Sequence, residues 1–256
     1  QVGLAGRAWP ANFHSNHDQP RALSRFGNDQ EYRYESATML AVLLLTRPGT
    51  PFVYYGEEIG MPNADYEELE HYLDIDSRSF YSLRTSEGHD AESVMKTIRY
   101  MSRDNARSPM QWTSGENVGF TKGTPWIRPA RNGQDVSVES EEGRERSVLK
   151  AYRQLLRLRK REPALRRGSF TPIDLGDSRL FCYQLTLKEQ TFLILLNLTQ
   201  ETVELPEKRM VGAWGDVAVY GNYEYSQAPR KIAPYEAVVN RPQGGREEAE
   251  DASKTL

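Results

Sequence analysis

The chain has 256 residues but only one cysteine, no long apolar run and no large excess of charge of one sign. The single cysteine, Cys182, excludes an internal disulfide. The longest apolar run, residues 39–45, is far shorter than the roughly 20 residues of a membrane-spanning helix. A net charge of −3, with both signs interspersed, gives no electrostatic reason to bind nucleic acid or an anionic membrane. We therefore expect a cytoplasmic protein with neither of these partners.

Signals for a bound metal or cofactor are also missing. The four histidines are scattered along the chain rather than spaced as metal ligands, at His14, His17, His71 and His89. No glycine-rich loop of the type that binds phosphates is present. The sequence thus predicts no metal site and no cofactor.

Residues 13–21 form the most informative segment, with the sequence Phe-His-Ser-Asn-His-Asp-Gln-Pro-Arg. A polar cluster of Asn16, His17 and Asp18 follows a short apolar lead-in, and Pro20 stiffens the exit. Barrel enzymes present their reactive side chains in this way, where strands end at the carboxyl-end face of the barrel. The triplet alone is more commonly part of a solvated turn, so its interpretation depends on the rest of the chain.

Four more segments point to a known family. They read Arg-Ala-Leu-Ser-Arg-Phe-Gly-Asn-Asp at 21–29, Pro-Gly-Thr-Pro-Phe-Val-Tyr-Tyr-Gly-Glu-Glu-Ile-Gly-Met at 48–61, Ser-Arg-Asp-Asn-Ala-Arg-Ser-Pro-Met-Gln-Trp at 102–112 and Gly-Phe-Thr-Lys-Gly-Thr-Pro-Trp-Ile at 119–127. In their order and approximate spacing, these segments resemble the α-amylase-type glycoside hydrolases, above all the oligo-1,6-glucosidase and α-glucosidase branch. The resemblance extends over residues 9–200 and is looser after residue 130.

This resemblance implies roles for four residues. Asp18 would hold the ring hydroxyls of the donor sugar and stabilise the transition state, and His17 would hydrogen-bond the same sugar. Arg107 would help to form the closed end of the pocket, which recognises the terminal glucose, and Arg21 would border the acceptor site. Plainer alternatives remain open for three of them. His17 would then cap a local backbone group, Arg107 would brace a loop through Asp104 or a carbonyl, and Arg21 would be structural.

The resemblance also implies that part of the active site is missing. The chain begins at Gln1, and the family's upstream blocks, with the nucleophilic aspartate and the acid/base glutamate, are absent. A retaining glycosidase needs both of these carboxyl groups, roughly 5–5.5 Å apart. We therefore expect the carboxyl-terminal part of an enzyme, with an incomplete active site. It should be inactive by itself and a monomer when complete.

The first part of the chain reads as α/β structure. Apolar spacing predicts a helix at 31–46 and a buried strand at 52–55, which together with the lead-in before residue 13 make a strand–helix–strand unit. By resemblance, the two strands would be the seventh and eighth of a (β/α)₈ barrel. Short helices are expected at 66–76 and 91–101.

The last helix and the strands after it suggest a second domain. An amphipathic helix is predicted at 147–161, with Arg159 on its wet face. Short alternating runs then predict an antiparallel β-domain. These runs are 169–175, 180–187, 191–198, 202–205, 217–220 and 235–240. The expected fold is therefore α/β plus β. It comprises the carboxyl-terminal portion of a catalytic barrel at 1–163, an antiparallel β-domain at 164–240 and a disordered tail at 241–256.

Two further sets of residues have less specific interpretations. Glu57 and Glu58 follow the expected strand at 52–55, where adjacent side chains point to opposite faces, so they do not form a catalytic dyad. Trp9, Trp112 and Trp126 lie in loop-like surroundings. Their rings either stack on sugars or clamp loops onto the body of the protein, and clamping is the favoured interpretation.

The function predicted from these motifs is a retaining, exo-acting α-glucosidase that hydrolyses terminal α-glucosidic bonds of short oligosaccharides or disaccharides. A trehalose-6-phosphate hydrolase and a sucrose isomerase share the same segments and are the close alternatives. Residues 24–27, Ser-Arg-Phe-Gly, resemble the hydrolases more than the isomerases. A non-catalytic glycosidase-like binding protein is the alternative from another class, although it would have no need for the intact Asn16, His17 and Asp18.

Overall fold

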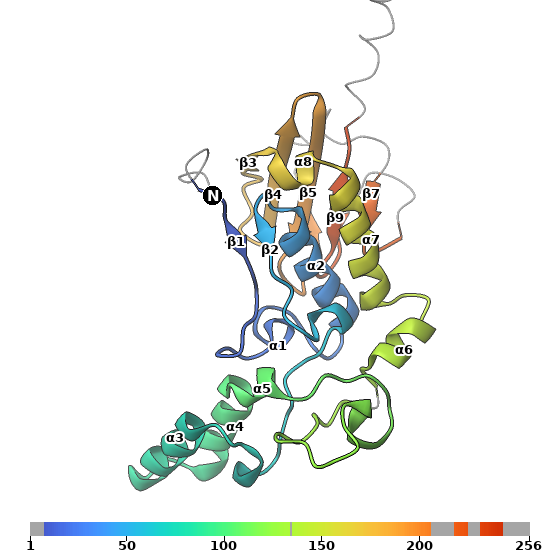
Figure 1. The fold of residues 1–256 in the computed structure, drawn as a ribbon. Helices are drawn as coiled ribbons and strands as arrows, with labels where there is room; N and C mark the ends of the chain where they lie inside the picture. The colour runs from blue at the N-terminus through green and yellow to red at the C-terminus, as the bar shows by residue number, and fades with distance from the viewer. Residues whose placement is uncertain (1–7, 134, 206–217, 225–230, 243–256) are drawn as a thin grey trace, which may run out of the picture. The chain divides into compact units, whose positions relative to one another are not determined.

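A computed structural model describes most of the chain (Figure 1). The described residues are 8–133, 135–205, 218–224 and 231–242. The chain divides into two compact units. The first unit contains Gln1–Asn12, Thr38–Phe52 and Arg153–Leu256, and the second contains Phe13–Ala37 and Val53–Tyr152.

A five-stranded antiparallel sheet dominates the first unit (Figure 1). Its strand order is β3 (Ser169–Ile173), β4 (Leu180–Leu187), β5 (Gln190–Asn197), β9 (Ala237–Asn240) and β7 (Ala218–Gly221). A short ladder pairs β6 (Val203–Glu204) with β8 (Lys231–Ile232). The predicted antiparallel β-structure is confirmed. Val217, predicted to begin a strand, and the part of the predicted disordered tail from residue 243 onward lie outside the described residues.

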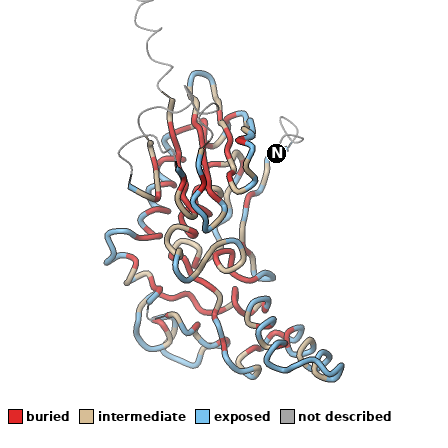
Figure 2. The backbone as a smooth tube through the Cα atoms, turned by 180° about the vertical axis from the view of Figure 1, so that it is seen from behind, coloured by how far each residue is buried: buried red, intermediate tan, exposed pale blue. Residues whose placement is uncertain are grey.

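The interior strands of this sheet form the core of the first unit. Residues 192–197 of β5 and all four residues of β9 are buried, as the red segments of the sheet in Figure 2 show. Burial on both faces explains why β5 reads as a continuous apolar run rather than as an alternating one. Cys182 on β4 lies in the same core, and burial raises the pKa of its thiol to about 12. Cys182 therefore serves as a packing residue.

Helices α2 (Arg33–Thr46) and α7 (Val148–Arg161) confirm the predicted helices to within two residues at each end. One detail of α7 differs from the prediction, because Arg159 is buried rather than on the wet face. Its Nη1 donates to the carbonyls of Leu45, Arg47 and Leu165 at 2.7, 3.0 and 2.7 Å, and its Nη2 donates to Gly49 at 2.5 Å. This guanidinium satisfies the carbonyls where α2 ends, so its burial is compensated.

The predicted strand at 52–55 is wrong. Instead, β2 (Thr50–Pro51) pairs in parallel with β1 (Ala11–Asn12), and the pairing ends with the hydrogen bond from Phe52 N to the Asn12 carbonyl at 2.8 Å. Phe52 and Val53 are exposed, so the apolar run is not the buried strand that its composition suggests. Tyr54 N donates to the Glu57 carboxylate at 3.2 Å instead of to a strand partner.

The second unit is mainly helix and loop. Its helices are α1 (Ala22–Phe26), α3 (Ile75–Ser86), α4 (Ala91–Met101), α5 (Asp104–Arg107) and α6 (Val138–Gly143), with 3₁₀ turns at Glu57–Ile59, Leu69–His71 and Glu116–Gly119. The first unit contains one more short helix, α8 (Ala164–Arg167). The helix predicted at 91–101 is confirmed as α4, which Asp90 caps by accepting from Ser93 N at 2.8 Å.

The helix predicted at 66–76 is wrong, because only a 3₁₀ turn forms there and α3 begins at Ile75. The carboxylate of Asp104 accepts hydrogen bonds from Leu73 N and Asp74 N at 2.6 and 2.8 Å, which draws these amides away from helical partners. Tyr66 and Tyr72 are buried in a core shared with α4. Among the described residues, no helix combines the length and the apolar character needed to cross a membrane.

Candidate functional site

A tight turn presents the Asn-His-Asp triplet of the second unit. Asn16 holds the turn, since its Oδ1 accepts from Asp18 N at 2.8 Å and its carbonyl accepts from Gln19 N at 3.4 Å. Local bonds of this kind are typical of asparagine in turns. The side chains of His17 and Asp18 remain 71% and 52% exposed, so both can be reached by a ligand. Asn16 therefore shapes the turn, and its neighbours carry the accessible groups.

Arg107 joins this turn from a distant part of the sequence. Its Nη2 lies 3.2 Å from Asp18 Oδ1, and its Nε donates to the His17 carbonyl at 3.0 Å. His17 Nε2 lies 3.2 Å from the other carboxylate oxygen of Asp18. The structure thus brings together three of the four residues predicted from the sequence. The carbonyl contact also fits the alternative role of Arg107 as a brace, so this side chain both fixes the turn and orients Asp18.

A second arginine, Arg103, extends the charged cluster. Its Nη1 lies 3.9 Å from Asp18 Oδ1, while its Nη2 lies 2.5 Å from Asp74 and 2.6 Å from Asp76. Burial of Asp74 works against its ionisation, but hydrogen bonds from Arg103 and Ser77 outweigh this and lower its pKa. The hydrogen bond with Asp74 in turn raises the pKa of Arg103. The arginine is therefore largely occupied by these two carboxylates.

Asp104 anchors the cluster from below the surface. It is almost fully buried, and its Oδ2 accepts from the backbone of residues 73 and 74. Its Oδ1 lies 3.8 Å from Arg107 Nη1 and has no hydrogen-bond partner among the described residues. Asp104 thus ties helix α5, which carries Arg107, to the start of α3, which carries Asp76. Sequence reasoning placed Asp104 only as a brace for Arg107 and did not identify Asp74 or Asp76.

Arg21 lies apart from the exposed groups. Its side chain is 1% exposed and donates to the carbonyls of Asn105 and Tyr55. The guanidinium also lies 4.7 Å from the centre of the Tyr55 ring. Burial lowers its pKa, the direction expected when a cation leaves water. These contacts favour the structural role that the sequence left open for Arg21.

The acidic pair Glu57 and Glu58 was predicted to follow a strand. Instead, it lies in a 3₁₀ turn. Glu57 Oε2 accepts from Tyr54 N at 3.2 Å, and its carboxyl group also bonds the Ser15 side chain. Burial raises the pKa of Glu57 to about 7 despite these bonds. One oxygen of each glutamate is buried without a hydrogen-bond partner among the described residues. The burial of Glu57 was not predictable from the sequence, because it depends on distant parts of the chain.

Trp9, Trp112 and Trp126 are 57, 48 and 73% exposed. Trp9 Nε1 donates to Thr50 Oγ1 at 2.8 Å, which ties its segment to β2 and fits the predicted clamp. The exposure of Trp112 and Trp126 does not decide between clamping and stacking on sugars. Within the described part of the chain, no three histidine, cysteine, aspartate or glutamate side chains gather in a way that would hold a metal ion.

The cluster as a whole presents the kinds of polar group that a polyhydroxylated ligand requires. Asp18 offers an accessible carboxylate that accepts hydroxyl protons, and His17 beside it offers a donor when its ring nitrogen is protonated. Arg107 fixes the carboxylate with a charge-assisted hydrogen bond, so little reorganisation is needed when a ligand arrives.

Comparison with known proteins identifies relatives of this chain. A family model described as "Alpha amylase, catalytic domain" matches residues 1–168. The chain is 39% identical over 240 residues to a trehalose-6-phosphate hydrolase of Escherichia coli K12, covering 93% of this chain and 43% of the relative. It is 38% identical over 246 residues to an oligo-1,6-glucosidase of Parageobacillus thermoglucosidasius, again covering 93% of this chain and 43% of the relative.

Solved structures show the same likeness. Trehalose-6-phosphate hydrolase of Bacillus licheniformis matches with a TM-score of 0.86 and 31% identity, over 93% of this chain and 44% of that protein. Isomaltulose synthase of Klebsiella sp. LX3 matches with a TM-score of 0.83 and 33% identity, over 94% of this chain and 44% of that protein. The chain thus spans less than half the length of these relatives. The extent of the family match and the similarity across nearly the whole chain show that this chain belongs to the α-amylase family.

Proposed function

We propose that this chain is the carboxyl-terminal part of a retaining, exo-acting α-glucosidase that acts on short oligosaccharides or disaccharides. The observation that carries the proposal is the exposed carboxylate of Asp18, fixed by Arg107 and flanked by His17, in a chain of the α-amylase family. The relatives named above include an oligo-1,6-glucosidase and a trehalose-6-phosphate hydrolase, which supports action on glucosides.

In this proposal Asp18 binds the donor sugar through two of its hydroxyl groups. The transition state of glycoside hydrolysis carries positive charge on the sugar ring. A fixed carboxylate opposes that charge, and hydrogen bonds that tighten as the charge develops lower the barrier. His17 donates to a neighbouring hydroxyl, and Arg107 holds Asp18 in position at the closed end of the pocket. Arg21 contributes by bracing the segment that follows the turn.

Residues that precede this chain would supply the nucleophile and the acid/base carboxyl group. We place β1 and β2 as the seventh and eighth strands of a (β/α)₈ barrel, a proposal that their parallel pairing supports. In such a barrel, the turn at residues 16–18 would follow the seventh strand at the face where barrel enzymes carry their active sites. Barrel residues would extend to 163, with the β-domain at 164–240.

The charge around Asp18 favours a neutral substrate over a phosphorylated one. Four aspartates, Asp18, Asp74, Asp76 and Asp104, surround the two arginines of the described cluster. The arginines already pair with these carboxylates, so neither arginine of this cluster is free to bind a phosphate group. A trehalose-6-phosphate hydrolase therefore stays the second candidate, and its phosphate-binding group would have to come from elsewhere.

The test is Asp18→Asn in the complete enzyme, assayed on maltose, isomaltose and trehalose 6-phosphate. The amide keeps the size of the side chain but removes its charge, so kcat should fall by about 100- to 1,000-fold while the circular dichroism spectrum stays unchanged. Arg84→Lys, in an exposed ion pair on α3, is the matched control and should retain activity. Activity of the Asp18→Asn enzyme within a few-fold of wild type would overturn the proposal. Preferential turnover of trehalose 6-phosphate would favour the second candidate.

A further inference from the structure

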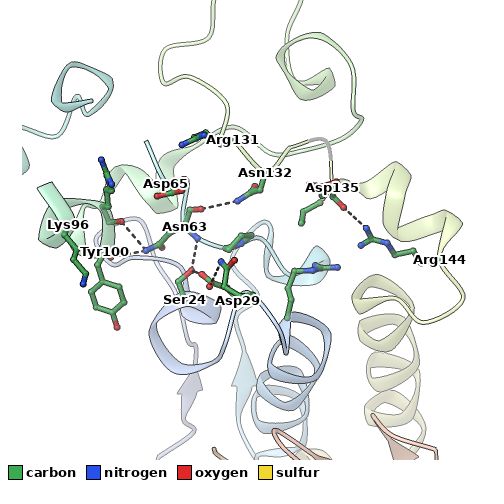
Figure 3. A pocket seen from close by; sticks show the side chains of 15 residues that line it. Ser24, Asp29, Asn63, Asp65, Lys96, Tyr100, Arg131, Asn132, Asp135 and Arg144 are labelled. Atoms are coloured by element: carbon green, nitrogen blue, oxygen red, sulfur yellow. Dashed lines mark hydrogen bonds between the residues drawn. The ribbon is translucent and has the colours of Figure 1, made fainter. Parts of the chain in front are cut away.

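A polar cavity lies in the second unit and shares no residue with the cluster around Asp18. Its volume is about 860 Å³, within the roughly 300–1,000 Å³ of typical ligand sites. Residues from three parts of the unit line it (Figure 3), at 24–33, 62–65 and 96–144. Ligand cavities are usually lined by apolar groups, whereas charged and amide side chains dominate this one.

The floor of the cavity is built around Asn63, whose polar groups are all used. Its backbone N donates to Ser24 Oγ at 2.8 Å, and its Oδ1 accepts from Arg21 N at 3.0 Å. Its Nδ2 donates to the Tyr100 carbonyl at 3.0 Å, and its own carbonyl accepts from Asn132 Nδ2 at 3.2 Å. Figure 3 shows the bonds that join Asn63 to Ser24, Tyr100 and Asn132. The floor is therefore formed before any ligand binds.

Several of the cations at the cavity wall are neutralised by carboxylates of the chain itself. Glu141 pairs with Arg33 at 2.6 Å and with Arg144 at 2.8 Å. Arg131 pairs with Glu67. Five basic side chains line the cavity. Their positive charge is balanced by three lining aspartates together with Glu67 and Glu141. The cavity thus carries no net charge that would attract a phosphate or another anion.

The remaining groups offer both donors and acceptors. The side chain of Lys96 takes part in no hydrogen bond or ion pair among the described residues. Arg99 Nε also has no hydrogen-bond partner there, but it is buried. The carboxylates of Asp65 and Asp135 likewise make no hydrogen bond or ion pair within the described part of the chain. Tyr100, 47% exposed, adds an aromatic ring at the end of the cavity that carries Lys96 (Figure 3).

We propose that this cavity is a second saccharide-binding site, separate from the site around Asp18. A sugar is neutral, and each of its hydroxyl groups both donates and accepts a hydrogen bond. It therefore satisfies the free ammonium donor of Lys96 and the free carboxylate acceptors at the same time, which an anion does not. The exposed ring of Tyr100 provides an apolar surface for the C–H face of a sugar ring. The ligand class is an unphosphorylated glucose oligomer of two to three units.

The test measures binding directly, by calorimetric titration of maltotriose into the complete protein carrying Asp18→Asn, so that hydrolysis does not interfere. The double variant Lys96→Ala/Asp65→Asn removes one free donor and one free acceptor. Asparagine also suits position 65, where φ is 52°. Maltotriose affinity should fall by about tenfold or more in the double variant. Lys122→Ala, which removes an exposed lysine outside the cavity, should leave it unchanged.

Three outcomes would overturn the proposal. One is equal affinity in the parent and the double variant, provided that both show the same thermal unfolding midpoint. Another is the absence of maltotriose binding to the Asp18→Asn protein. The third is tighter binding of glucose 6-phosphate than of glucose that is lost with Lys96→Ala, because that would identify an anion site. Since the readout is binding and not turnover, the result stands whether or not the complete protein is an α-glucosidase.

Discussion

Glu57 holds a carboxyl group in surroundings that favour its neutral form. Burial is the main cause, and it raises the pKa from an ordinary value of 4.5 to about 7. Hydrogen bonds from Ser15 and from the backbone of Tyr54 act in the opposite direction but do not cancel the effect. Ser15 also accepts from Ala22 N at 3.1 Å, so the glutamate acts on the segment that contains the Asn-His-Asp turn. The charge state of the Glu57 carboxyl group therefore affects the hydrogen bonding of the segment that presents Asp18.

This raised pKa predicts a pH-dependent stability. Between pH 4.5 and about 7 the folded state binds a proton that the unfolded state has released, so the free energy of unfolding falls as pH rises. The loss should be on the order of 3 kcal/mol and should be complete above pH 7. The loss is measured by urea unfolding of the wild type and of Glu57→Gln at pH 5 and pH 8. An equal pH dependence in both proteins would contradict the assignment.

The candidate site was only partly predictable from its residues. Asp18, His17 and Arg107 lie in short recognisable segments, and the structure brings them together. Asp74 and Asp76 carried no such signal, because they were expected at the end of a helix at 66–76 and the structure instead places them where α3 begins. Their contact with Arg103 depends on how the chain folds between α3 and α5, which local sequence does not encode.

At the scale of elements, periodic segments were predicted well and irregular ones were not. Helices α4 and α7 and strand β4 follow their apolar spacing closely. The predicted helix at 66–76 failed, because Asp104, about 30 residues later, takes two of its amides. The predicted strand at 52–55 failed because an apolar composition does not show whether a neighbouring strand is present to pair with it.

Helix α7 provides a test of how a buried cation connects elements. Arg159 donates to four carbonyls, and burial lowers its pKa to about 10. Arg159→Leu would leave these carbonyls without donors, and we expect a loss of about 3–5 kcal/mol in the free energy of unfolding. Arg157→Leu on the exposed face of the same helix should change it by about 0.5 kcal/mol or less. Equal effects in urea unfolding would mean that the carbonyl contacts contribute little.

For the molecule as a whole, we expect that the 256 residues alone do not hydrolyse an aryl α-glucoside. A retaining glycosidase needs a nucleophile and an acid/base carboxyl group roughly 5–5.5 Å apart, and Asp18 is neither of them in the proposed assignment. In the described cluster, Asp74 and Asp76 are bound to Arg103 and Asp104 is buried. Turnover by a purified, monodisperse sample, abolished by Asp18→Asn, would show that the chain contains a nucleophile and an acid that we have not identified.

The division of the chain into units has a consequence for its synthesis. The second unit uses residues 13–37 and 53–152, whereas the first needs residues 1–12, 38–52 and 153–256. A ribosome releases the chain from its amino-terminal end, so every segment of the second unit emerges before the sheet of the first unit is made. Residues 50–51 can pair with β1 as soon as they emerge, whereas the partners of residues 38–52 within 153–256 follow only after about a hundred further residues. The hydrogen bonds from Arg159 to the carbonyls of Leu45, Arg47 and Gly49 therefore form late in synthesis, after the whole of the second unit has emerged.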